Sequence, residues 1–163
     1  MTGGIPLALH PPDPAVRLRR SRLTDAESLR QACWPERPFG SIYQLLSRAQ
    51  QYYGLNRGAG FVLLAADEQP IGFGQFTVWP TCAEISDLVV AEAYRGKGLG
   101  TALIQHIVQE AGRGGVTTLE IGAVLDNVRA LALYHRLGFT DSHTVHLQEG
   151  IETIQYLRLE IRS

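Results

Sequence analysis

The stretch that decides the fold is Arg95-Gly96-Lys97-Gly98-Leu99-Gly100, in which three glycines stand on alternate positions. The β-rich run AEISDLVVA at 83–91 comes before it. Apolar residues follow it at helical spacing, at Leu99, Ala102, Leu103 and Ile107. Glycines in such a strand-to-helix turn let the main chain approach a ligand closely and direct several N–H groups to one point. Since a helix N-terminus has a partial positive charge, the turn predicts a site for phosphate oxygens, most naturally a pyrophosphate.

The spacing of this turn distinguishes three kinds of phosphate-binding loop. A P-loop requires G-x-x-x-x-G-K-[ST], which this sequence does not contain. A dinucleotide fingerprint starting at Gly96 would need glycine at position 101, where the chain has Thr101. The pattern Arg/Gln-x-x-Gly-x-Gly/Ala is satisfied by Arg95, Gly98 and Gly100. In this respect the turn resembles the acetyl-CoA loop of the GCN5-related N-acetyltransferase (GNAT) superfamily, although the loop alone could also be a plain tight connection.

A second block makes the resemblance specific. Residues 127–139, NVRALALYHRLGF, are similar to the superfamily segment N-x-x-A-x-x-L-Y-x-x-x-G-F throughout. Asn127, Ala130 and Tyr134 are spaced to lie along one helical face, where a ligand could meet all three. Asn127 is equally well explained as an N-cap, and both roles can hold together.

The resemblance implies that acetyl-CoA is the acyl donor. It also implies a pantetheine arm along 88–90, with the pyrophosphate at the glycine turn. The coenzyme-binding residues implied are Leu88, Val89, Val90, Arg95, Gly96, Lys97, Gly98, Leu99, Gly100, Thr101, Asn127, Ala130 and Tyr134.

Deprotonation of an acceptor amine requires a base or a path to solvent. Glu84 stands at the position where several members of the superfamily have a glutamate base, so the resemblance implies that role for it. A solvated strand charge is the alternative for Glu84. Regular alternation would put Glu84, Ser86, Leu88 and Val90 on one face and Asp87 on the other, and a bulge would change that parity. Asp87 is therefore the second candidate, as a base or as an anchor for a cationic substrate, and solvent is the third.

Tyr134 matches the tyrosine that often acts as general acid in the superfamily, near the coenzyme sulfur; otherwise it is a half-buried core residue. Cys82 is a poor candidate for an acyl-carrying nucleophile, because no histidine stands at a recognisable spacing to activate it. We interpret Cys33 and Cys82 as free, buried thiols. His143 and His146 would point to opposite faces of a strand, so we expect no metal site there.

The hydrophobic patterns predict a mixed α/β fold in the order β-α-α-β-β-β-α-β-α-β-β, with a central, mostly antiparallel sheet flanked by helices. Strands are expected at 16–22, 61–66, 71–79, 83–91, 116–124, 139–147 and 151–161. Helices are expected at 24–33, 41–53, 99–112 and 127–137. Thr24 with Glu27, and Ser41 with Gln44, form the capping-box patterns that predict the first two helix starts. We expect a flexible arm over 1–14 and a single domain over 15–163.

Composition limits the partners. The chain has 163 residues and a formal net charge of -1, which gives no broad positive field for a nucleic acid. It has no apolar run long enough to span a bilayer, and its start is a poor signal peptide, so we expect no membrane partner and a cytoplasmic enzyme.

The expected activity is acetyl transfer from acetyl-CoA to a primary amine of a small molecule or peptide. Alternatives are a non-catalytic acyl-CoA sensor, a hydroxyl acceptor, or a longer acyl group. The sequence is compatible with a homodimer but specifies neither the acceptor nor the oligomeric state.

Overall fold

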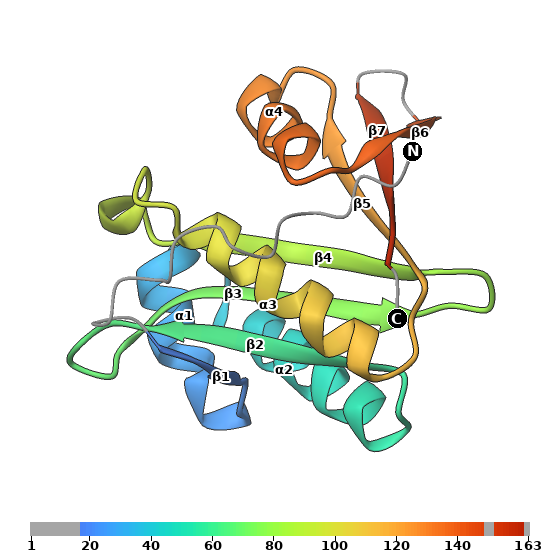
Figure 1. The fold of residues 1–163 in the computed structure, drawn as a ribbon. Coiled ribbons are helices and arrows are strands. Elements are labelled where there is room, and N and C mark those ends of the chain that lie inside the picture. Colours follow the sequence, from blue (N-terminus) through green and yellow to red (C-terminus); the bar gives the residue numbers. More distant parts are fainter. Residues whose placement is uncertain (1–16, 149–151, 162–163) are drawn as a thin grey trace.

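The computed structural model describes residues 17–148 and 152–161, which form one seven-stranded sheet in the order β1-β2-β3-β4-β5-β7-β6 (Figure 1). All neighbouring strands pair antiparallel except β4 and β5, which are parallel. The strands are β1 (Arg17–Arg20), β2 (Gly58–Leu64), β3 (Pro70–Val78), β4 (Ala83–Val90), β5 (Thr118–Val124), β6 (Thr140–His146) and β7 (Thr153–Glu160). The main helices are α1 (Ala26–Cys33), α2 (Phe39–Gly54), α3 (Leu99–Arg113) and α4 (Val128–Arg136). The predicted element order and mixed α/β class are confirmed, whereas the predicted arm over 1–14 lies outside the described residues.

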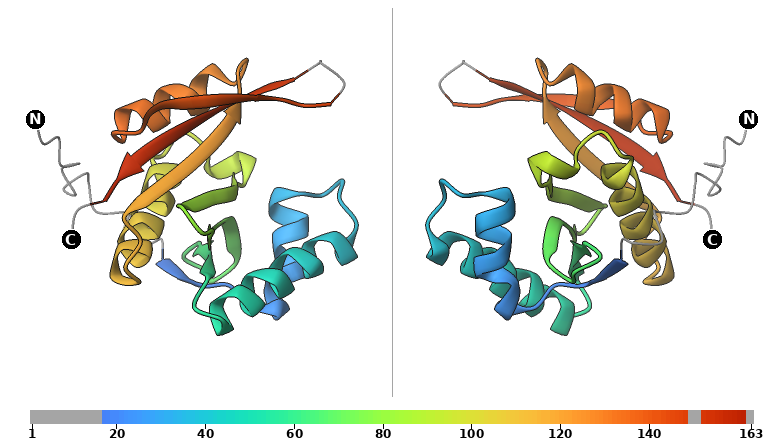
Figure 2. Two further views of the ribbon diagram at one scale, coloured as in Figure 1. Left: turned by 90° about the vertical axis from the view of Figure 1, so that its right-hand side faces the viewer. Right: turned by 90° about the vertical axis from the view of Figure 1, so that its left-hand side faces the viewer.

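Helices cover both faces of the sheet (Figure 2). On the α3 and α4 face, apolar side chains such as Leu103, Ile107 and Leu119 form the larger core cluster. On the α1 and α2 face, a second cluster includes Leu29, Ile42 and Phe73. Alternate strand residues thus enter one core or the other, as the period of two requires. None of the helices within the described ranges is long and apolar enough to cross a membrane.

The starts of the first two helices differ from the sequence-based prediction. A 3-10 turn (Leu23–Asp25) leads into α1, and neither α1 nor α2 has a side-chain hydrogen bond at its N-cap, so both predicted capping boxes are wrong. Asp25 instead accepts hydrogen bonds from the Arg22 N–H at 2.8 Å and from the Arg19 guanidinium at 2.8 and 2.9 Å. This contact between β1 and the helix start is not visible in a local pattern.

Strands β4 and β5 separate along their length (Figure 1). Their parallel pairing covers only Ala83–Leu119, Glu84–Glu120 and Ile85–Ile121. Beyond this point β5 continues to pair with β7, and β4 continues to pair with β3. Among the described residues, the 86–90 part of β4 therefore has no strand neighbour on its β5 side, and its backbone groups there are available to a ligand.

Candidate functional site

The glycine turn has the geometry of an anion-binding nest. Gly96 and Gly98 both have φ of 77°, in the left-handed region that glycine adopts at low cost. Gly98 is the N-cap of α3 and supplies no side-chain cap, so the first N–H groups of that helix lack intrahelical partners. A Cβ placed on Gly96 or Gly98 would meet no atom within 4 Å, so the turn faces open space. Such a turn can bind phosphate oxygens through main-chain N–H groups.

Two basic side chains flank this turn. The Arg95 Nε donates a 3.0 Å hydrogen bond to the Val90 carbonyl, which ties the turn to the end of β4. The Lys97 ammonium lies 5.4 Å from the centre of the Tyr94 ring. Both side chains are exposed, so their positive charges add to the attraction that the helix terminus has for an anion.

The second motif lies beside the first. A Cβ on Gly100 would be 4.0 Å from a methyl group of Leu133, so the first turn of α3 packs against α4. Asn127 caps α4, because its side chain accepts a 3.2 Å hydrogen bond from the Ala130 N–H. The cap explanation of Asn127 is confirmed, and the remaining amide N–H groups of its exposed side chain are left for another partner.

Tyr134 is 8% exposed and belongs to the core cluster on the α3 and α4 face. Its ring centre lies 6.3 Å from that of Phe139. Burial raises the pKa of the Tyr134 hydroxyl above its ordinary value. The hydroxyl therefore keeps its proton at neutral pH and can donate a hydrogen bond more readily than it can release the proton.

Strand β4 contains a bulge at Asp87 and Leu88. Gln75 is opposite Ser86 and Phe73 is opposite Val89, so the two bulge residues face the single residue between them on β3. Asp87 has φ of 57°, which is uncommon for a residue other than glycine. Its Oδ2 accepts a 2.6 Å hydrogen bond from the buried Gln75 side chain.

The bulge changes which side chains share a face. A Cβ on Gly74 would be 2.6 Å from Leu88 and 3.1 Å from Ile107 of α3, so Leu88 points toward α3. Ser86 and Glu84 precede the bulge and lie on the α1 and α2 face, the face of Gln75 and its partner Asp87. Regular alternation predicted that Glu84 and Leu88 share one face and that Asp87 lies on the other, and beyond Ser86 this prediction is wrong. The alternative with a bulge in the strand is correct.

Glu84 is a half-buried carboxyl beside other acidic groups. Burial raises the pKa of Glu84, the nearby charges of Glu120 and Asp87 raise it further, and a hydrogen bond from the Trp79 side chain opposes the increase. A carboxylate with an elevated pKa is a better proton acceptor than an ordinary surface glutamate. Glu84 lies toward the α1 and α2 face of the sheet, whereas Tyr134 belongs to the core cluster on the α3 and α4 face.

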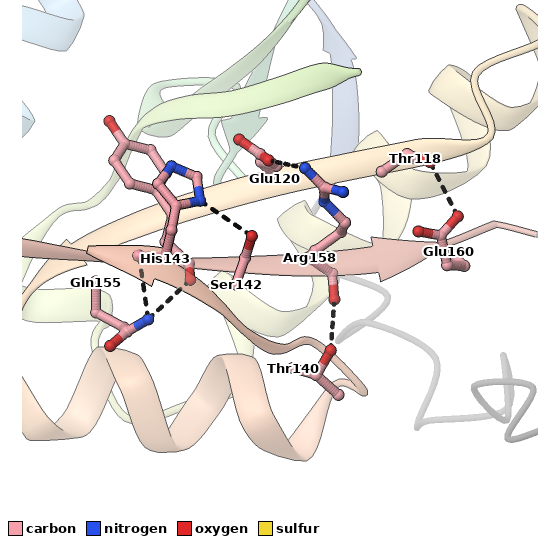
Figure 3. A network of polar contacts seen from close by, with 9 residues as sticks. Thr118, Glu120, Thr140, Ser142, His143, Gln155, Arg158 and Glu160 are labelled. Carbon is pink, nitrogen blue, oxygen red and sulfur yellow. Dashed lines mark hydrogen bonds and ion pairs between the residues drawn. The ribbon is translucent and has the colours of Figure 1, made fainter. Parts of the chain in front are cut away.

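Three residues on the face of the sheet that carries Glu84 were not identified from the sequence. Glu120 on β5 is paired with Arg158 of β7 at 2.6 Å, as Figure 3 shows. Tyr156 of β7 stacks on His143 at 4.9 Å and lies over Gly122, where a Cβ would be only 2.9 Å from its ring. Glu120 and Arg158 alternate with apolar residues in their strands, which predicts a polar face. Only the strand order shows that this face is the one on which Glu84 lies.

The two cysteines and the histidines at 143 and 146 form neither a nucleophile site nor a shared metal site. Cys33 and Cys82 are unpaired but only partly buried, which corrects the expectation that both are buried. Burial raises the pKa of Cys33 to about 11 and also raises that of Cys82, which disfavours the nucleophilic thiolate. His143 contacts Ser142, whereas His146 contacts Thr153. Within the described part of the chain, no group of three or more His, Cys, Asp or Glu is placed to hold a metal ion.

Comparisons with known proteins agree on one family. The profile of the Acetyltransferase (GNAT) family matches residues 23–139. An uncharacterised N-acetyltransferase of Methanocaldococcus jannaschii is 31% identical over 93 residues, which cover 53% of this chain and 41% of that protein. The [ribosomal protein bS18]-alanine N-acetyltransferase of Escherichia coli is 37% identical over 60 residues, which cover 37% of this chain and 40% of the enzyme. The chain thus spans about 40% of the length of these curated relatives.

The fold is also found among solved structures. A Salmonella typhimurium protein solved with its cofactor acetyl-CoA superimposes with a TM-score of 0.73, covering 91% of this chain and 95% of that one. The two sequences are 21% identical, so the likeness concerns the fold.

Proposed function

Since the chain belongs to the acetyltransferase (GNAT) family, we propose that it transfers the acetyl group of acetyl-CoA to a primary amine of a small molecule or peptide. The observation that supports this most strongly is the separation of β4 from β5 directly beside the glycine turn. A linear thioester bound along the free edge of β4 would have its phosphates at the turn and its acyl group near Glu84.

The donor would be held mainly by backbone groups. The pyrophosphate would accept hydrogen bonds from N–H groups between Gly96 and Thr101, with Arg95 and Lys97 adding positive charge. The pantetheine amides would pair with the edge formed by Leu88, Val89 and Val90, which β5 leaves unpaired. Across the gap, α4 would present Asn127, Ala130 and Tyr134.

In the proposed reaction the acceptor approaches from the α1 and α2 face, where Glu84 accepts a proton from the ammonium group. The neutral nitrogen then forms a bond to the thioester carbonyl carbon, and collapse of the tetrahedral species breaks the carbon–sulfur bond. The second nitrogen proton leaves to solvent, or to Glu84 once Glu84 has passed its first proton to solvent, and the thiolate is protonated to free CoA. Tyr134, on the other face, would donate a hydrogen bond to the departing sulfur.

The charge of the acceptor side favours an amine. Among Glu84, Asp87 and Glu120, only Glu120 is paired with Arg158, so an ammonium group would be attracted to the remaining negative charge. The bS18-alanine N-acetyltransferase among the relatives acts on an amine of this kind. The test is to determine the mass of the product and its stability to hydroxylamine, which cleaves esters but not amides. An ester product would indicate a hydroxyl acceptor, and a heavier adduct would indicate a longer acyl group.

We propose in addition that the enzyme is cytoplasmic, and a homodimer is the assembly to test for. The two free cysteines are consistent with a reducing compartment. Light scattering of the purified protein would give its oligomeric state.

A further inference from the structure

Three charged side chains stand in register across three neighbouring strands. Glu84 of β4 is opposite Glu120 of β5, and Glu120 is opposite Arg158 of β7. Residues opposite one another in adjacent strands point to the same face, and the strands themselves lie about 4.8 Å apart. Glu84, Glu120 and Arg158 therefore form a row, and within that row Glu120 lies between Glu84 and Arg158.

Glu120 is held in place by its partner. The Arg158 Nη2 donates to the Glu120 Oε1 at 2.6 Å (Figure 3). The side chain of Glu120 is 12% exposed, whereas that of Arg158 is 45% exposed. A carboxylate that is largely removed from solvent is weakly screened by water, so its charge acts strongly on a neighbour.

We propose that Glu120, anchored by Arg158, is a positioning residue that tunes Glu84 as the proton acceptor of the transfer reaction. The inference rests on the proposed function, in which Glu84 is the base. Glu120 itself need not touch the acceptor or the thioester, because it acts through its charge on Glu84.

The titratable groups that interact with Glu84, or with its neighbour Glu120, come from three strands and from the residue before β4. Asp87 is on β4, Glu120 on β5, and Tyr156 and Arg158 on β7, while Cys82 directly precedes β4. Among the charged groups, Glu120 has the largest effect on the pKa of Glu84, and Asp87 raises that pKa to a smaller extent. Asp87 is held separately by Gln75, so the effects of the two acids can be separated by substitution.

The arrangement would favour proton transfer in two ways. A negative charge at Glu120 makes Glu84 more basic, which brings it closer to the proton affinity of an ammonium group. Arg158, which is paired with Glu120, would offset part of that charge and so limit the increase in the basicity of Glu84. Removal of Glu120 and removal of Arg158 should therefore move the titration of Glu84 in opposite directions.

The experiment is a ¹³C NMR titration of the Glu84 side-chain carboxyl in protein labelled at glutamate, with Glu84→Gln used to assign the signal. In Glu120→Gln the Glu84 titration should move to lower pH. In Arg158→Gln it should move to higher pH, and Arg158→Lys, which keeps the positive charge, should restore it toward the wild-type position. Glu110→Gln on α3, which removes a carboxylate paired with Arg113, is the matched control and should leave the titration unchanged.

The acid limb of kcat/KM should follow the same shifts in the same variants. An unchanged Glu84 titration in Glu120→Gln, or the same direction of shift in Glu120→Gln and Arg158→Gln, would overturn the proposal. If Arg158→Gln does not fold, Glu120→Gln and Arg158→Lys still decide it. Absence of any acetyl transfer would contradict the proposed function instead, because the NMR titration does not depend on turnover.

Discussion

The Gln75 side chain donates a 2.6 Å hydrogen bond to Asp87 at the bulge of β4. Asp87 has left-handed backbone geometry there, with φ of 57°. Such a conformation costs free energy in a residue other than glycine and persists when surrounding contacts fix it. The extra residue turns Leu88 toward α3 and leaves Glu84 and Asp87 on the face toward α1 and α2. One residue in β4 thus separates the acidic face of the site from the face on which we propose that the coenzyme binds.

Asp87→Ala is predicted to destabilise the protein by about 1 to 2 kcal/mol, because alanine tolerates the left-handed region poorly and offers Gln75 no acceptor. Asp87→Asn keeps the acceptor oxygen and suits that region, so its free energy of unfolding should stay close to that of the wild type. Urea unfolding of the two variants measures the difference. Equal stabilities would show that neither the backbone geometry nor the hydrogen bond matters.

The proposed anion site can be tested by replacing Gly98 with aspartate or with asparagine, two side chains of nearly the same shape that differ in charge. Asparagine and aspartate both tolerate φ of 77° better than other side chains, and a Cβ at this position meets no neighbour within 4 Å. Gly98→Asp should weaken CoA binding much more than Gly98→Asn, since only aspartate places negative charge beside the phosphates. Calorimetric titration with CoA measures both affinities. Equal affinities in two folded variants would place the pyrophosphate elsewhere.

Much of this arrangement could be predicted from the sequence, because it depends on local pattern. The order of helices and strands follows from hydrophobic periodicity, and the helix start at Gly98 and the cap at Asn127 follow from residue type. Contacts between side chains of different elements could not be predicted in this way. At the start of α1, Asp25 replaces the expected Thr24–Glu27 capping box, because the Arg19 side chain of β1 binds it.

The contact of Glu120 within the site could not be predicted from local sequence either. Its pairing with Arg158 depends on β7 lying between β5 and β6, an order that periodicity does not encode. The sequence alone did not decide whether Asp87 lies on the same face of β4 as Glu84, because the bulge depends on how β3 pairs with β4.

Glu84→Gln is predicted to lower turnover by about 10²- to 10⁴-fold while acetyl-CoA affinity stays nearly unchanged. In the wild type the basic form of Glu84 is lost as pH falls through its raised pKa, so the acid limb of kcat/KM should lie above the usual range of a glutamate. The limb should be absent in Glu84→Gln. Rates measured across the pH range, with Glu160→Gln as a control on β7, test this. A wild-type profile in Glu84→Gln would transfer the role to Asp87 or solvent.

Tyr134→Phe should reduce turnover by roughly 10²-fold, with little change in stability or coenzyme affinity, because only the hydrogen-bond donor is removed. Burial raises the pKa of Tyr134, so complete proton transfer to the sulfur is unfavourable and stabilisation of the leaving thiolate is the expected role. The defect should shrink with acetyl donors whose thiols are more acidic. A defect of the same size with every donor would exclude leaving-group stabilisation, and no defect would make Tyr134 a core residue.

The most direct test of the proposed function is the steady-state release of free thiol from acetyl-CoA, measured with a panel of polyamines, amino acids, aminoglycosides and N-terminal peptides. The account predicts that at least one amine accelerates thiol release, that the amine gains one acetyl group by mass, and that Glu84→Gln abolishes most of the acceleration. Tight binding of acetyl-CoA with no release above the uncatalysed rate for any amine would contradict it and would identify the protein as a binding module.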